Sequence, residues 1–152
     1  MNDCVFCKLV SNQIPCAKIW EDEKFMAFLD INPNTKGMTV VIPKSHFDSY
    51  VIDMPDNIYC EFFLSTKKVA KILEKGLNTK RVAIVMEGLM INHAHIKLYP
   101  IHGLEEKFTE ILNDKRIFFN KYEGYISTKF GPQAKLSYLK TLADEIKEKN
   151  NA

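Results

Sequence analysis

The feature that most constrains how this chain folds is the stretch from Asn92 to Pro100, in which polar and apolar residues alternate. Successive side chains of a β-strand point to opposite faces, so this period of two predicts a strand. One predicted face carries His93, His95 and Lys97, and the other carries Ala94, Ile96 and Leu98. This stretch alone leaves two interpretations open: an amphipathic strand with a polar outer face, or a strand that presents two imidazoles and an ammonium for chemistry.

The composition fits an ordinary folded domain. With 152 residues the chain is long enough to bury a core without disulfides, and its 46% hydrophobic and 26% charged residues are typical of a globular protein. A net charge of +2 provides no basic stripe of the kind that neutralises nucleic-acid phosphates. No apolar run approaches the length of a membrane span. We therefore expect a cytoplasmic protein with no nucleic-acid partner and no membrane partner.

The four cysteines are unevenly placed: Cys4 and Cys7 form a Cys-x-x-Cys pair, while Cys16 and Cys60 stand alone. A thioredoxin-type redox motif would require a strand before the pair, and none is predicted there. A disulfide framework is not expected in a reducing compartment. The pair is therefore interpreted as a metal-binding motif or as two small buried hydrophobic residues.

Hydrophobic periodicity and turn-forming residues divide the chain into elements. Strands are predicted at 17–20, 24–29, 38–42, 81–86 and 92–100, and helices at 5–10, 55–76, 104 to about 112 and 132–149. The helix over 55–76 is expected to have an apolar face of Ile58, Phe62, Val69, Ile72 and Leu73 and to end at Gly76 in a left-handed cap. The last helix carries an apolar stripe of Leu136, Leu139, Leu142, Ala143 and Ile146. The order of these elements predicts an α+β fold with a mainly antiparallel sheet and one long helix after the third strand.

Several motifs in a fixed order point to a known family. They are Cys4-Val5-Phe6-Cys7-Lys8, Ile14-Pro15, Phe28-Leu29-Asp30-Ile31-Asn32-Pro33, Val41-Ile42-Pro43-Lys44-Ser45-His46 and His93-x-His95-x-Lys97-x-x-Pro100. With these motifs the chain resembles the histidine triad (HIT) nucleotide hydrolases and transferases. The resemblance implies a homodimer with a HIT-like domain over residues 1–103. The helical C-terminal extension, residues 104–152, is expected to pack on the same domain or on the dimer partner.

The resemblance also implies a reaction at the α-phosphate of a purine nucleotide conjugate, such as a dinucleoside polyphosphate or a nucleoside phosphoramidate. In the family, the middle histidine of the triad attacks phosphorus and forms a nucleotidyl-histidine, from which water releases the nucleoside monophosphate. The matching residue here is His95. A neutral imidazole suits this role because it is a good nucleophile near neutral pH. The alternative for His95 is a half-buried structural histidine.

Further residues match positions that bind the nucleotide in the family. Asp30 matches the ribose-binding residue, since a carboxylate accepts hydrogen bonds from both ribose hydroxyls. Its alternative is a turn-forming aspartate, and one residue can serve both roles. The positions that build an apolar slot for the base are matched by Phe6, Ile14, Phe28 and Ile31. On composition alone these four residues would be ordinary core.

Part of the family holds a zinc ion with the N-terminal Cys-x-x-Cys pair, a histidine after the third strand and the first histidine of the triad. The matching residues are Cys4, Cys7, His46 and His93. Four protein ligands complete a tetrahedral site and leave no position for substrate. The resemblance therefore implies a structural zinc ion.

The chain departs from the family pattern at two places. Lys97 stands where the third histidine is expected, and Gly88 leads directly into residues 89–92 in place of a longer polar loop that binds phosphate. A lysine offers charge and hydrogen-bond donors but a less acidic proton than an imidazolium. We expect polyphosphate leaving groups to be favoured over amines, with Lys97 or Asn92 contacting the phosphates.

These departures leave open a second function, a nucleotide-binding module with little or no turnover. Beyond the motifs, Tyr122, Tyr125 and His102 are candidates to reach the active site. The alternative for His102 is an exposed loop residue. Trp20 is expected to pack in the fold.

Overall fold

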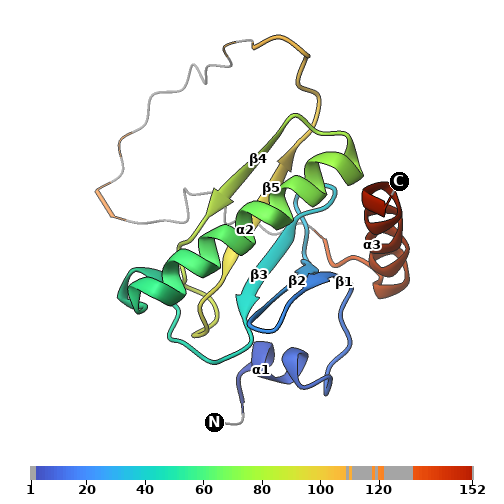
Figure 1. Ribbon diagram of the computed structural model, residues 1–152. Helices are drawn as coiled ribbons and strands as arrows, with labels where there is room; N and C mark the ends of the chain where they lie inside the picture. Colours follow the sequence, from blue (N-terminus) through green and yellow to red (C-terminus); the bar gives the residue numbers. More distant parts are fainter. Residues whose placement is uncertain (1–2, 109, 111–117, 119, 122–131, 152) are drawn as a thin grey trace.

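A five-stranded antiparallel sheet forms the centre of the computed structural model, which describes residues 3–108, 110, 118, 120–121 and 132–151 (Figure 1). The strands are β1 (Lys18–Glu21), β2 (Phe25–Leu29), β3 (Thr39–Pro43), β4 (Arg81–Val85) and β5 (Ile96–Ile101). They lie in the order β1-β2-β3-β5-β4, and every neighbouring pair is antiparallel. This arrangement confirms the predicted α+β fold class.

The hairpin of β1 and β2 closes through the side chain of Asp22. Its carboxylate oxygen Oδ1 accepts hydrogen bonds from the backbone N–H groups of Lys24, at 2.9 Å, and Phe25, at 2.7 Å. Such aspartate turns reverse the chain without help from glycine. The next strand, β3, is buried along its whole length. Its continuous run of apolar and β-branched residues is the pattern of a strand covered on both faces.

Helices cover the two faces of the sheet unequally. The long helix α2 (Asp56–Leu77) lies across one face, beside α3 (Leu136–Asn151), as Figure 1 shows. In β2 the alternate residues Ala27 and Leu29 belong to the core beneath these helices. Phe28, with the opposite orientation, packs with the short helix α1 (Val5–Val10) on the other face. In β2 and β3 the period of two therefore divides alternate residues between two hydrophobic clusters.

The long helix confirms the predicted apolar face but not the predicted cap. Phe62, Val69 and Leu73 are fully buried along one side of α2. The helix ends at Leu77, and the left-handed conformation belongs to Asn78, with φ 52° and ψ 47°. The prediction of a cap at Gly76 is wrong because asparagine also tolerates this conformation. Gly76 lies within the helix instead.

The histidine stretch is a shorter strand than predicted. β5 begins at Ile96, where it pairs with Val41, so His93 and His95 precede the strand. The N–H of Ala94 donates to the carbonyl of Phe47 at 2.8 Å, which holds this part of the chain against the loop after β3. Every residue from 93 to 100 is buried. The polar outer face is therefore a wrong interpretation, since the three polar side chains lie inside the protein.

The C-terminal part also differs in extent from its prediction. α3 begins at Leu136 rather than at residue 132. Four residues of its predicted stripe, Leu139, Leu142, Ala143 and Ile146, are buried in the main core, and the fifth, Leu136, is partly buried against it. Residues 104–108 and 110 are not helical, so the helix predicted from residue 104 is absent there. Residues 109, 111 and 112 lie outside the described part of the chain. A short 3₁₀ helix, Val51–Asp53, was not predicted. Among the described helices, none has the length and apolar character to span a membrane.

Candidate functional site

Two loops that are distant in sequence are bound together beside α1. The side-chain oxygen of Asn92 accepts the backbone N–H of Ser49 at 3.0 Å, and its nitrogen donates to the carboxylate of Asp48 at 3.0 Å. At Gly88, where φ is +67°, an added Cβ would lie 2.6 Å from the carbonyl oxygen of Ser49. Only a glycine permits this close approach in this conformation. The contacts bring the loop of His46 against the segment of His93.

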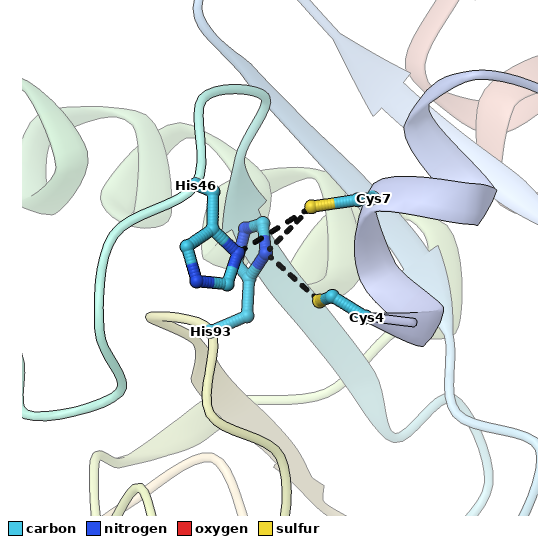
Figure 2. A group of neighbouring side chains, drawn as sticks. All are labelled: Cys4, Cys7, His46 and His93. Atoms are coloured by element: carbon cyan, nitrogen blue, oxygen red, sulfur yellow. Dashed lines mark hydrogen bonds between the residues drawn. The ribbon is translucent and has the colours of Figure 1, made fainter. Parts of the chain in front are cut away.

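Four potential metal ligands converge where these loops meet α1. Figure 2 shows Cys4 and Cys7 turned toward the rings of His46 and His93. Their candidate ligand atoms all lie within 4.8 Å of one another. His93 Nδ1 is 3.4 Å from the sulfur of Cys4 and 3.6 Å from that of Cys7, and His46 Nδ1 is 3.4 Å from the sulfur of Cys7. The structure thus brings together the four residues that the sequence motifs selected.

The geometry and the protonation of this cluster suit a metal ion. His93 donates from Nε2 to the carbonyl of Pro43 at 2.9 Å, which leaves the lone pair on Nδ1, the atom nearest the two sulfurs. A tetrahedral ion with bonds of about 2.3 Å to sulfur and about 2.0 Å to nitrogen separates these ligands by roughly 3.5 Å. The observed separations of 3.4 to 3.6 Å match that edge.

Electrostatics also favour a cation at this position. Burial lowers the pKa of His93 and so favours the neutral imidazole that binds metals. Burial, followed by the adjacent Cys4 sulfur, raises the pKa of the Cys7 thiol. A divalent cation reverses this penalty because it stabilises the thiolate. Two thiols and two imidazoles form the donor set that zinc prefers.

His95 lies directly beside the cluster and is 3% exposed. Its Nδ1–H donates to the carbonyl of His93 at 2.8 Å, so Nε2 carries the lone pair. Burial lowers the pKa of His95, and the nearby ammonium of Lys97 lowers it further. The ring of Phe6 packs edge-on against both histidines, with centroid separations of 5.7 Å to His93 and 5.5 Å to His95. The site therefore holds a neutral imidazole in a fixed orientation.

A cavity of about 430 Å³ opens beside His95. Phe28, Val40 and Lys97 are paired across β2, β3 and β5 and form a row along it. The predicted catalytic and nucleotide-binding residues that line it are Phe6, Ile14, Phe28, Asp30, Ile31, His95 and Lys97. Asn92 is not among the lining residues of the described chain, because its amide is bound to Ser49 and Asp48.

Asp30 joins the polar part of this cavity and is 8% exposed. Its Oδ1 accepts the backbone N–H of Asn32 at 2.8 Å, which is the turn-forming role considered from the sequence. An ionised carboxylate has about four acceptor sites, so this bond leaves capacity for other donors. The carboxylate is therefore held by its own loop at the wall of the cavity.

The other sequence candidates lie elsewhere. The exposed His102 donates from its ring to the carbonyl of Lys36 at 2.9 Å, and Trp20 packs against the main core. Tyr122 and Tyr125 lie outside the described residues. The cavity also has walls that were not assigned from the sequence, formed by Met90, Ile91, Leu136 and Leu139. The apolar stripe of α3 was the available signal for the last two, but it identified them only as core.

Comparison with known proteins connects this site to a family. The family model described as HIT domain matches residues 11–102. An uncharacterized HIT-like protein of Methanocaldococcus jannaschii is 38% identical over 117 residues, covering 72% of this chain and 90% of the relative. An adenosine 5′-monophosphoramidase of Schizosaccharomyces pombe is 33% identical over 98 residues, 64% of this chain and 73% of the relative. An adenylylsulfatase of Arabidopsis thaliana is 28% identical over 104 residues, which cover 65% of this chain and 52% of the relative.

Solved structures share the fold. A hypothetical histidine triad nucleotide-binding protein from Sulfolobus tokodaii superposes with a TM-score of 0.74 at 23% identity, covering 97% of this chain and 92% of the neighbour. A zinc-bound histidine triad family protein from Mycobacterium smegmatis gives a TM-score of 0.68 at 23% identity, with coverages of 97% and 92%. At these identities the likeness establishes the fold alone. The domain match and the relative at 38% identity establish that the chain belongs to the HIT family.

Proposed function

We propose that this protein is a nucleotide hydrolase or nucleotidyl transferase that acts at the α-phosphate of a purine nucleotide conjugate. Relatives named adenosine 5′-monophosphoramidase and adenylylsulfatase support nucleotide hydrolysis as the general type of activity. The observation that carries the proposal is the arrangement around His95. This buried imidazole has Nδ1 bound to a carbonyl, and it shares one cavity with Asp30 and Lys97.

His95 serves as the nucleophile in this proposal. The lone pair of Nε2 attacks the α-phosphorus, a phosphorus–nitrogen bond forms, and the leaving group departs with the electron pair of its former bond to phosphorus. The substituted imidazole is then a cation, because Nδ1 keeps its proton. The carbonyl of His93, 2.8 Å from Nδ1, stabilises that cation. Water next attacks phosphorus and loses a proton to solvent. The phosphorus–nitrogen bond breaks, its electron pair returns to Nε2, and the nucleoside monophosphate leaves neutral His95.

Lys97 stabilises negative charge in this scheme. It is 7% exposed, and its position in β5 places it in the same cavity as His95. A buried ammonium favours the charge that develops on phosphate oxygens during displacement. A polyphosphate leaves as an anion without needing a proton, whereas an amine leaves well only when protonated. We therefore assign dinucleoside polyphosphates as better substrates than nucleoside phosphoramidates.

The remaining cavity residues bind the nucleotide. Asp30 accepts hydrogen bonds from the ribose hydroxyls with the acceptor capacity that the Asn32 bond leaves. The base occupies the apolar space between α1 and the loop after β2, beside Phe6, Ile14, Phe28 and Ile31. We retain Asn92 only as an indirect contributor, because its amide holds the loop that positions His46.

Zinc is the metal that we assign to the Cys4, Cys7, His46 and His93 cluster. The donor set and its edge lengths support this choice, and a zinc-bound fold neighbour agrees with it. A bound ion ties α1 to the two loops that carry the histidines. Because Phe6 lies between the two cysteines in sequence and packs on His95, the same ion steadies one wall of the cavity.

A homodimer is the proposed assembly. β4 forms one edge of the described sheet, and Ile84 on this strand is 45% exposed. A strand at the edge of a sheet that carries an exposed apolar side chain is suited to pairing with a second chain. Sedimentation at several protein concentrations tests this assignment, and a monomer throughout would contradict it.

The functional test measures release of AMP from diadenosine polyphosphate and from adenosine phosphoramidate. We expect wild-type protein to release AMP and His95→Ala to lose this activity by at least about a thousandfold. His102→Ala is the matched control, because this histidine is exposed and hydrogen-bonds to the Lys36 carbonyl. Nucleotide binding without AMP release in the wild type would instead support the nucleotide-binding module.

A further inference from the structure

We infer that α3 forms one wall of the nucleotide cavity at its base-binding end, and that Leu136 is a nucleotide-binding residue. This inference rests on the proposed function, since it concerns the same cavity. Leu136 and Leu139 lie beyond residues 11–102, which match the HIT domain. Both line the cavity that contains His95 and Asp30. A helix outside the matched domain thus contributes directly to the site.

The start of α3 is joined to the loop that carries Asp30. The N–H of Ala134 donates to the carbonyl of Ile31 at 2.9 Å, just before the helix begins at Leu136. Ile31 is the residue after Asp30 and lines the cavity itself. The two walls, one from the loop after β2 and one from α3, are therefore connected by a backbone hydrogen bond.

Contacts with α2 fix the remainder of α3. An added Cβ on Gly76 would lie 2.6 Å from Cγ2 and 2.9 Å from Cα of Ile146, so the two helices touch closely at this point. Near the end of α3, the side-chain nitrogen of Asn150 donates to the carbonyl of Ile72 at 2.9 Å. Leu139, which is 3% exposed, anchors the helix in the main core. Leu136 is consequently presented to the cavity by a packed helix.

The position of Leu136 separates it from the reacting phosphate. Leu136 lies near the loop after β2, because Ala134 is hydrogen-bonded to Ile31 of that loop. Lys97 lies in β5, and β3 runs between β2 and β5 in the sheet. Two strand spacings correspond to about 10 Å. Leu136 contributes only apolar atoms, which suit the face or edge of a base and not a phosphate. Its side chain should therefore affect nucleotide binding more than the chemical step.

The experiment measures AMP binding by calorimetry with the full-length protein as purified. Leu136→Trp adds bulk to the cavity and should raise the Kd of AMP by about tenfold or more. Leu136→Ala removes contact without adding bulk and should raise Kd by about threefold. Ser137→Trp is the matched control, because Ser137 is the exposed neighbour on α3 and does not line the cavity. Its Kd should stay within about twofold of wild type.

A kinetic measurement separates this role from a structural one. With a hydrolysable adenosine conjugate, Leu136→Trp should raise KM and leave kcat within about twofold, because Leu136 lies beside the loop after β2, two strands away from Lys97 in β5. If the wild-type protein binds AMP and Leu136→Trp binds it with the same Kd, this inference is overturned and the proposed function stays intact. Equal losses in Leu136→Trp and Ser137→Trp would also overturn it. A wild-type protein that binds no nucleotide would overturn the proposed function as well.

Discussion

Replacing Gly76 by alanine tests whether α3 is docked on α2 as the structure has it. Gly76 is buried within α2, and the added Cβ would lie 2.6 Å from Cγ2, 2.9 Å from Cα and 3.0 Å from Cβ of Ile146. Since one of these atoms is backbone, a side-chain rotation alone does not relieve the overlap. The two helices must separate by a few tenths of an ångström or more to accept the new methyl group.

Two opposing effects set the size of the change. Alanine favours a helix interior over glycine by about 1 kcal/mol. Overpacking a filled interface costs about 1 to 3 kcal/mol. We therefore expect Gly76→Ala to lower the free energy of unfolding by about 1 kcal/mol, which corresponds to a Tm decrease of roughly 2 to 4 °C in a chain of this size. Urea denaturation with a fixed m-value measures the difference.

A double-mutant cycle with Ile146→Ala identifies the cause. Ile146→Ala removes the Cγ2 atom nearest to the new methyl group, so the double variant should be more stable than the sum of the single effects by at least about 0.5 kcal/mol. An additive cycle would be expected if Gly76 acted as the left-handed cap predicted from the sequence. Stabilisation by Gly76→Ala alone would refute the close approach of the two helices.

The metal cluster, Lys97 and the cap of α2 can each be tested by substitution. Structural zinc contributes on the order of 10 kcal/mol to folding. Cys4→Ser should therefore lower the zinc content measured by elemental analysis and reduce Tm by roughly 10 °C or more. Cys60→Ser, at an exposed position on α2, is the control and should change neither the zinc content nor Tm. Far less than one zinc per wild-type chain, together with an unchanged Tm in Cys4→Ser, would contradict the metal assignment. The wild-type protein should cleave diadenosine polyphosphate faster than adenosine phosphoramidate. In Lys97→His, the ratio of the kcat/KM for the phosphoramidate to that for the polyphosphate should rise by about tenfold or more. Faster cleavage of the phosphoramidate by the wild type would contradict the role of Lys97. Asn78→Ala should lower the free energy of unfolding by about 1 kcal/mol, because Asn78 has φ 52° and alanine disfavours this conformation. Asn78→Gly should leave the free energy of unfolding close to that of wild type. Equal stabilities of the two variants would argue against the left-handed cap.

Local patterns in the sequence were sufficient for most of the elements. The continuous apolar run at β3 and the spacing of Phe62, Val69 and Leu73 in α2 report burial directly, because side-chain direction follows the period of the backbone. The end of α2 was misplaced because glycine and asparagine both accept the left-handed conformation. Gly76 lies within the helix instead, where it packs closely against Ile146 of a helix that is distant in sequence.

The site was only partly accessible from the sequence. Residue types and motif order singled out Cys4, Cys7, His46 and His93, although 89 positions separate Cys4 from His93 in the chain. Alternation could not reveal that His93 and His95 precede β5 and are buried, because their environment comes from the loop after β3. The contribution of α3 to the cavity was missed for a similar reason. An apolar stripe predicts burial, but it does not specify which surface the helix covers.

Nucleophilic attack by His95 should leave a nucleotide covalently bound to this residue, and that adduct can be detected. Wild-type protein mixed with diadenosine polyphosphate and quenched at alkaline pH, where a bond between phosphorus and imidazole survives, should yield a peptide that carries an adenylyl group on His95 by mass spectrometry. His95→Ala should yield no adenylylated peptide, and His102→Ala should behave as wild type. AMP release by His95→Ala at the wild-type rate, or an adenylyl group on another residue of an active protein, would contradict the role of His95 as the nucleophile.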